Sequence, residues 1–134
     1  MTQMGWQVYV AVTLGSALGG LGRYIMTNAI PSEDFPWGTV LVNISGSFII
    51  GFFAALSAVE GRMPASAEMR VFIMAGLCGG FTTFSAFSLQ TLDLVREDQW
   101  MAAGGNVVGS VVLCLLAVWL GHLAASALNP INGG

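Results

Sequence analysis

An uncharged run over residues 71–92 constrains the fold of this chain more than any other stretch. A helix needs roughly 20 apolar residues to cross a bilayer, and this run is long enough. Its first half nevertheless holds three glycines, and its middle holds Thr82 and Thr83. Glycine lowers helix stability, and Ser and Thr offer the backbone competing hydrogen bonds. We therefore predict a membrane helix that breaks near residues 79–83 and then resumes.

Such a break is a candidate site for an ion or a substrate. Non-helical backbone at membrane depth is tolerated only where protein or a water-filled cavity surrounds it. In membrane transporters, broken helices of this kind form the binding site.

The composition predicts an all-α integral membrane protein of one domain over residues 1–134. Only 8% of the 134 residues are charged, against about 25% in soluble domains, and the mean hydropathy is +0.77. Charged or proline-containing loops divide the chain into four spans with both termini on one side, at residues 6–28, 37–59, 69–95 and 100–128.

The predicted spans carry uncharged polar groups and no carboxylate or lysine in their interiors. Proton-coupled transporters usually need an intramembrane carboxylate, so this class is disfavoured. No nucleophile with a partner base is apparent, so we predict that the chain is not an enzyme. Cys78 and Cys114 lie in apolar runs and are interpreted as small hydrophobic residues. Gly15 and Gly19 form a small-xxx-small pattern, which is common in helix contacts within membranes and also by chance.

Two amides and two phenylalanines are the strongest candidate site residues. Asn43 and Asn106 lie inside predicted spans, where an amide serves either an interhelical hydrogen bond or a functional site. Phe84 and Phe87 share a helix face, and a ring edge is electropositive enough to approach an anion, although packing explains most such pairs. From these residues alone, the sequence predicts an oligomeric four-span channel or transporter.

The segment from Gly79 to Ser88, which reads GGFTTFSAFS, closely resembles the signature of the Fluc (CrcB-type) fluoride channels. The segment Gly19–Tyr24 resembles the end of that family's first helix, and Trp37–Asn43 resembles the opening of its second. Gly109-Ser110 is similar to part of its fourth helix.

The resemblance implies a fluoride-selective passive channel that exports fluoride from the cytoplasm through a bacterial inner membrane and so gives fluoride resistance. It implies an antiparallel, dual-topology homodimer with two narrow pores. A structural sodium ion at the dimer axis would be held by the backbone carbonyls of Gly79 and Thr82.

The resemblance also assigns roles to individual side chains. Phe84 and Phe87 would contact fluoride, Asn43 would donate its amide to it, and Arg23 would lie at the aqueous vestibule. Further residues fall on or near the polar path of the pore, namely Thr83, Ser85, Ser88, Gln90, Asn106 and Ser110.

The chain departs from the family pattern at two positions. Ala86 replaces the usual threonine, so one hydroxyl is missing between the two phenylalanines, and Gln90 stands where a glutamate is frequent. Both changes affect the polar path of the pore rather than the function that the resemblance implies. An uncharged Gln90 still offers amide donors to an anion.

Two other functions remain open from the sequence. A small dual-topology multidrug-type transporter has similar length and span number, but it would need a glutamate in the first helix, and residues 6–22 hold none. A non-conducting accessory membrane subunit is the second alternative. The arginines near the span ends number two on each side, Arg62 and Arg70 against Arg23 and Arg96, so they favour neither orientation.

Overall fold

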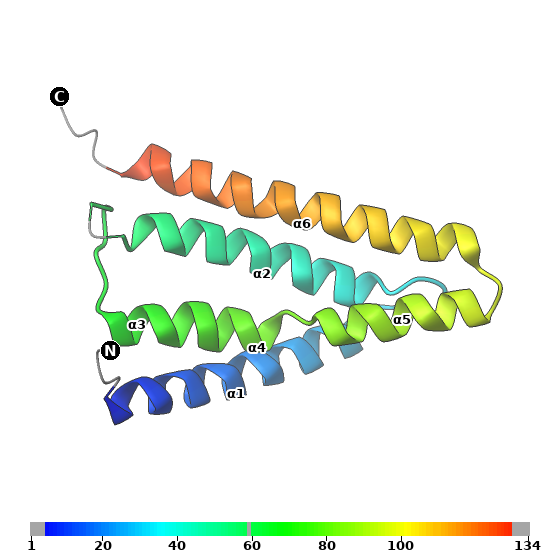
Figure 1. Ribbon diagram of the computed structural model, residues 1–134, viewed down its shortest axis with the longest axis horizontal. Helices are drawn as coiled ribbons and strands as arrows, with labels where there is room; N and C mark the ends of the chain where they lie inside the picture. Colours follow the sequence, from blue (N-terminus) through cyan, green and yellow to red (C-terminus); the bar gives the residue numbers. More distant parts are fainter. Residues whose placement is uncertain (1–4, 59, 130–134) are drawn as a thin grey trace.

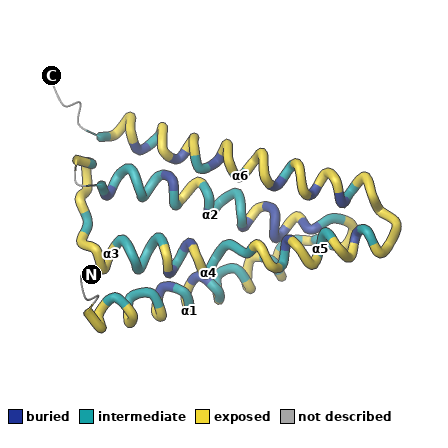
Figure 2. The backbone as a smooth tube through the Cα atoms, in the orientation of Figure 1, coloured by how far each residue is buried: buried dark blue, intermediate teal, exposed yellow. Residues whose placement is uncertain are grey.

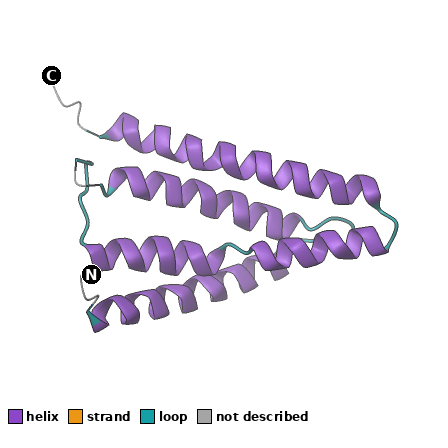
Figure 3. Cartoon of the chain, in the orientation of Figure 1, coloured by secondary structure: helices purple, strands orange, loops and turns teal. Residues whose placement is uncertain are grey.

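The computed structural model describes residues 5–58 and 60–129, which form four helical rods that run roughly along one direction (Figures 1 and 3). The first two rods are α1 (Trp6–Ala29) and α2 (Trp37–Leu56), and the last is α6 (Trp100–Leu128). The third rod is composite: α3 (Ala67–Arg70), η1 (Val71–Cys78), α4 (Gly79–Phe81) and α5 (Phe84–Arg96). All four rods are long and apolar enough to cross a membrane, as the sequence predicts.

The helix bounds lie close to the predicted ones. The first and third rods extend one or two residues beyond the predicted spans, and the fourth has the predicted bounds. The second rod ends at Leu56, whereas its predicted end at residue 59 lies outside the described residues.

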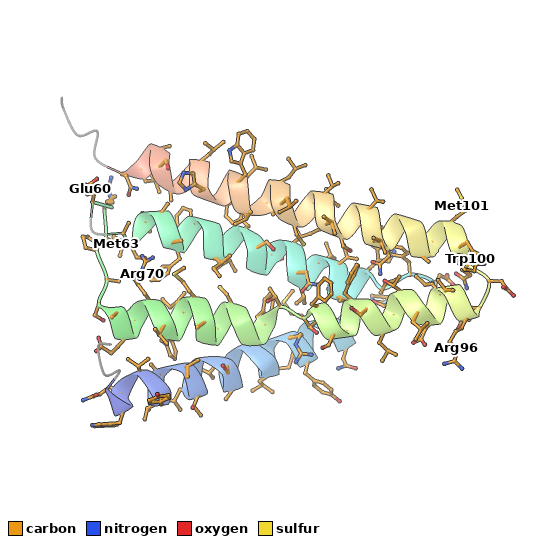
Figure 4. All side chains as sticks on the ribbon, viewed as in Figure 1. Glu60, Met63, Arg70, Arg96, Trp100 and Met101 are labelled. Carbon is orange, nitrogen blue, oxygen red and sulfur yellow. The ribbon has the colours of Figure 1, made fainter. Side chains whose placement is uncertain are left out.

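The two ends of the helix array carry different loops (Figure 4). Glu60, Met63 and Arg70 lie at the end where α1 begins and α6 ends, while Arg96, Trp100 and Met101 lie at the other. This is the arrangement expected for four consecutive crossings.

Most of each rod is exposed or half-buried, and buried positions are few (Figure 2). Large side chains such as Leu18, Val108 and Trp119 point outward, as expected where lipid surrounds the protein. The buried residues are mostly glycine and alanine, which let membrane helices approach closely.

Glycines bring α1 against the first half of the third rod. A Cβ added at Gly15 would lie 2.8 Å from the Cα of Gly76, and one at Gly80 would lie 3.0 Å from the Cα of Ser16. These distances leave no room for a side chain. The Gly15–Gly19 pattern therefore marks a real helix contact, and glycines at 51 and 121 do the same between α2 and α6.

The break in the third rod is narrower than predicted. Gly79 and Gly80 remain helical, and the backbone becomes extended only at Thr82 (φ −84°, ψ 156°) and Thr83 (φ −151°, ψ 114°). Neither glycine therefore forms the break itself, and Gly80 is needed for close packing against α1. Before the break, η1 is a π-helix over Val71–Cys78, which the sequence did not predict. Such wide turns are rare and are frequently found at functional sites.

Candidate functional site

Asn43 on α2 holds the break in the third rod. Its side-chain oxygen accepts a hydrogen bond from the Thr83 N–H at 2.8 Å, and its Nδ2 donates to the Thr83 carbonyl at 3.1 Å. The amide thus satisfies both backbone groups of a residue that has left the helix, which would otherwise be costly in a membrane. The Thr83 hydroxyl accepts from the Ala86 N–H at 3.1 Å and caps the start of α5.

A cavity of about 390 Å³ opens beside the break. Seven of the residues predicted for the site line it, and they come from α2, the third rod and α6: Asn43, Gly79, Thr82, Thr83, Phe84, Phe87 and Ser110. The sequence reasoning did not place the other seven there: Gly46, Ser47, Ile50, Cys78, Val111, Cys114 and Leu115. No charged side chain is among these lining residues. The wall offers hydroxyl, amide, aromatic and aliphatic groups to an occupant.

Gly46 could have been found from its neighbours in sequence. It lies three residues after Asn43, one helical turn away on the same face. A Cβ at Gly46 would collide with the methyl group of Thr82. The absence of a side chain therefore lets the extended segment sit against α2.

Phe84 and Phe87 form an aromatic pair at the cavity. Their ring centroids are 5.3 Å apart and the rings are tilted by 52°. Phe87 is only 7% exposed, whereas Phe84 is 76% exposed. The pair thus joins the closed side of the cavity to the outer surface of the protomer, and its electropositive ring edges are available to an anion.

A chain of hydrogen bonds leads from the cavity into the contact between α5 and α6. The Ser110 hydroxyl donates to Oδ1 of Asn106 at 3.2 Å, and Asn106 Nδ2 donates to the Thr91 hydroxyl at 2.9 Å. Thr91 in turn donates to the Phe87 carbonyl at 2.8 Å. Asn106 is 1% exposed and does not line the cavity, so it reaches an occupant only through Ser110.

Besides Asn106, four predicted site residues lie outside the cavity wall. Ser85 and Ser88 are exposed, with Ser85 paired to the Thr83 hydroxyl and Ser88 donating to the Phe84 carbonyl. Arg23 donates from Nε to the Gly80 carbonyl at 3.2 Å, so it lies at the level of the break. Gln90 lines a second pocket of about 210 Å³ together with Glu33, Asp34, Asp93 and Glu97.

Two backbone carbonyls at the break have no hydrogen-bond donor among the described residues. The Gly79 carbonyl lacks its helical donor because the Thr83 N–H bonds Asn43 instead. The Thr82 carbonyl lacks its donor because the Ala86 N–H bonds the Thr83 hydroxyl. Carbonyl oxygens are suitable ligands for a hard cation.

Comparison with known proteins identifies the family to which this chain belongs. The family model described as "CrcB-like protein, Camphor Resistance (CrcB)" matches residues 10–122. The chain is 58% identical over 129 residues to the "Fluoride-specific ion channel FluC" of Opitutus terrae, covering 94% of this chain and 98% of the relative. Proteins of that name from Methylocella silvestris and Paramagnetospirillum magneticum are 55% and 56% identical, covering 93% and 90% of this chain and 98% and 97% of the relatives. The chain therefore belongs to the CrcB-like protein family.

Proposed function

We propose that this chain is a fluoride-selective passive channel that exports fluoride from the bacterial cytoplasm and so protects the cell. The observation that carries the proposal is the cavity at the helix break, with its uncharged lining and its Phe84–Phe87 pair. Relatives at 55–58% identity are named fluoride-specific ion channels, which supports the same function. The protein is a multi-pass membrane protein and not an enzyme.

The lining suits passage of a small anion. Fluoride is strongly hydrated, so a selective path must replace its water with closely placed donors without binding it too tightly to leave. The two side-chain N–H groups of Asn43 are such donors, and one of them is free beyond its bond to Thr83. The ring edges of Phe84 and Phe87 add weak positive potential and no fixed charge, so they attract the ion without trapping it.

We further propose that two copies form an antiparallel homodimer with two pores. In the protomer, Gly105 and Gly109 of α6 meet nothing within 4 Å, so this GxxxG face is available for contact with another copy. Phe84 is 76% exposed, although it belongs to the proposed pore. A second copy packed over the mouth of the cavity would cover the ring and close the path from lipid.

The proposed dimer would hold a sodium ion on its axis. The free carbonyls of Gly79 and Thr82, doubled by the second copy, supply the oxygen ligands that a hard cation prefers. The ion would keep these carbonyls satisfied inside the membrane, where an unpaired polar group is costly. Its role is therefore structural.

Ion efflux from liposomes that contain the purified protein tests the proposed function. Fluoride and chloride electrodes record both ions released down equal gradients, with protein-free liposomes as the control. We expect rapid fluoride release and far slower chloride release. Comparable release of the two ions would contradict fluoride selectivity, and release of neither would favour the accessory-subunit alternative.

The multidrug-type transporter makes a different prediction. Such a protein would move cationic dyes by using an intramembrane carboxylate. The described part of α1 and α2 holds no acidic residue, and Glu68 and Asp93 lie near the ends of the third rod. Fluoride release without dye transport would exclude this alternative.

A further inference from the structure

The hydrogen-bond chain behind the cavity has a direction. Thr91 donates to the Phe87 carbonyl, Asn106 donates to Thr91, and Ser110 donates to Asn106. A hydroxyl has a single proton, so both hydroxyls are fully used as donors inside the protein. Ser110 lines the cavity and therefore turns lone pairs, not its proton, toward an occupant.

This direction is unfavourable for an anion. A lone pair repels fluoride, whereas an O–H donor would form a charge-assisted hydrogen bond with it. Ser110 can serve the proposed pore only if its proton leaves Asn106 and turns to the cavity. A lone rotation of Ser110 would leave Oδ1 of Asn106 unpaired at a site that is 1% exposed, which is costly.

We propose that Asn106 is a positioning residue that turns over when the anion arrives and reverses the whole chain. In the reversed chain Thr91 donates to Oδ1 of Asn106, Nδ2 of Asn106 donates to Ser110, and Ser110 donates to the anion. No buried group loses its last partner, because the amide exchanges its donor and acceptor ends. The inference rests on the proposed function, since it concerns the same pore.

The reversal costs little within the protein. The hydrogen bond that disappears is the one from Thr91 to the Phe87 carbonyl, and that carbonyl lies in α5, where the helix already supplies a backbone donor. The hydrogen bond gained is to an ion and is stronger than a neutral one. Ser110 thus becomes a donor only while an anion is present, which assists entry without creating a permanent trap.

Nuclear magnetic resonance of the protein in detergent, with 15N-labelled asparagine, tests the reversal. The side-chain amide signal of Asn106 is the one that is missing from the Asn106→Leu variant. We expect sodium fluoride to shift this signal in the parent, because its hydrogen-bond acceptor changes from Thr91 to Ser110, and sodium chloride to leave it in place. In Ser110→Ala, fluoride should leave the signal where it was. A signal that ignores fluoride in the parent, or that moves equally in Ser110→Ala, would overturn the proposal.

Fluoride flux through the same variants gives an independent test. Ser110→Ala should lower flux per folded channel by about tenfold, the effect of losing one hydrogen bond to an ion. Asn106→Leu should cost less, because it removes the acceptor that holds the Ser110 proton as well as the amide that would orient it. The double variant should conduct no worse than Ser110→Ala, because Asn106 acts through Ser110 alone. If Asn106 merely held α5 to α6, or touched the ion itself, the two losses would multiply.

The outcome separates this inference from the proposed function. A parent protein that passes no fluoride would contradict the proposed function. A parent that passes fluoride, with losses that multiply in the double variant, would contradict only the reversal. Thermal unfolding of each variant, measured alongside, normalises flux to the folded fraction.

Discussion

The side chain of Asn43 pairs with the backbone of Thr83 as another strand of peptide would, accepting at 2.8 Å and donating at 3.1 Å across 40 residues of sequence. These two hydrogen bonds satisfy the backbone groups at the helix break, which would otherwise be unpaired inside a membrane. They also place the free N–H of Asn43 at the cavity. Asn43 thus has both of the roles that its sequence position left open: it forms an interhelical hydrogen bond, and it lines the candidate site.

Asn43→Asp should reduce fluoride flux by at least about tenfold. An ionised carboxylate cannot donate to the Thr83 carbonyl and repels an anion in the cavity. Efflux from liposomes measures the loss. Asn28→Asp is the matched control, because Asn28 is exposed and bonds only its own helix at Tyr24. Full flux through a folded Asn43→Asp channel would remove Asn43 from the pore.

Phe84→Ile and Phe87→Ile should both lower fluoride flux, because an aliphatic side chain fills space without an electropositive edge. Phe87→Ile should also lower the melting temperature more, since Phe87 is 7% exposed and Phe84 is 76% exposed. Phe48→Ile is the control: Phe48 stacks on Phe52 within α2, at 6.2 Å between ring centroids. If the α5 variants conducted like Phe48→Ile, the pair would be packing alone.

Gly80→Ala should destabilise the protein by about 1–3 kcal/mol, the usual cost of overpacking. Its Cβ would lie 3.0 Å from Ser16 Cα and 3.1 Å from Gly20 N, both on the backbone of α1. Gly104→Ala is the control, because that position has nothing within 4 Å. Thermal unfolding in detergent compares the two, and equal melting temperatures would contradict the close α1 contact.

Sodium should raise the thermal stability of the dimer, because the Gly79 and Thr82 carbonyls lack donors across the break. Unfolding is measured in sodium chloride and in the chloride of a large organic cation at equal ionic strength. The same melting temperature in both salts would argue against a structural ion.

The protein should insert in both orientations in similar amounts, because two arginines flank the membrane on each side. A cysteine at Met63, which is 63% exposed, marks one end in a chain whose Cys78 and Cys114 are replaced by Ala. An impermeant thiol reagent should label about half of it in sealed vesicles and the rest after opening.

A cysteine at Asp34, on an exposed loop at the other end, is the matched reporter and should give the same result. Nearly complete labelling at one position with almost none at the other would show a single orientation and contradict the antiparallel dimer.

The sequence by itself determined the membrane class, the four helices and the position of the break. These follow from local chemistry: long uncharged runs must span lipid, charged loops must leave it, and adjacent threonines weaken a helix. The sequence also pointed to Asn43, Phe84 and Phe87, because polar or paired aromatic residues stand out in an apolar run.

Only the tertiary structure decided which residues meet. The partner of Asn43 is a backbone group 40 residues away, and Asn106 reaches the cavity only through Ser110. The glycines at 79 and 80 weaken a helix in isolation, yet here both stay helical, and α1 packs against Gly80 too closely for any side chain. Hydrogen-bond partners and close contacts between helices depend on how the rods are placed, and residue type along a single rod does not encode that placement.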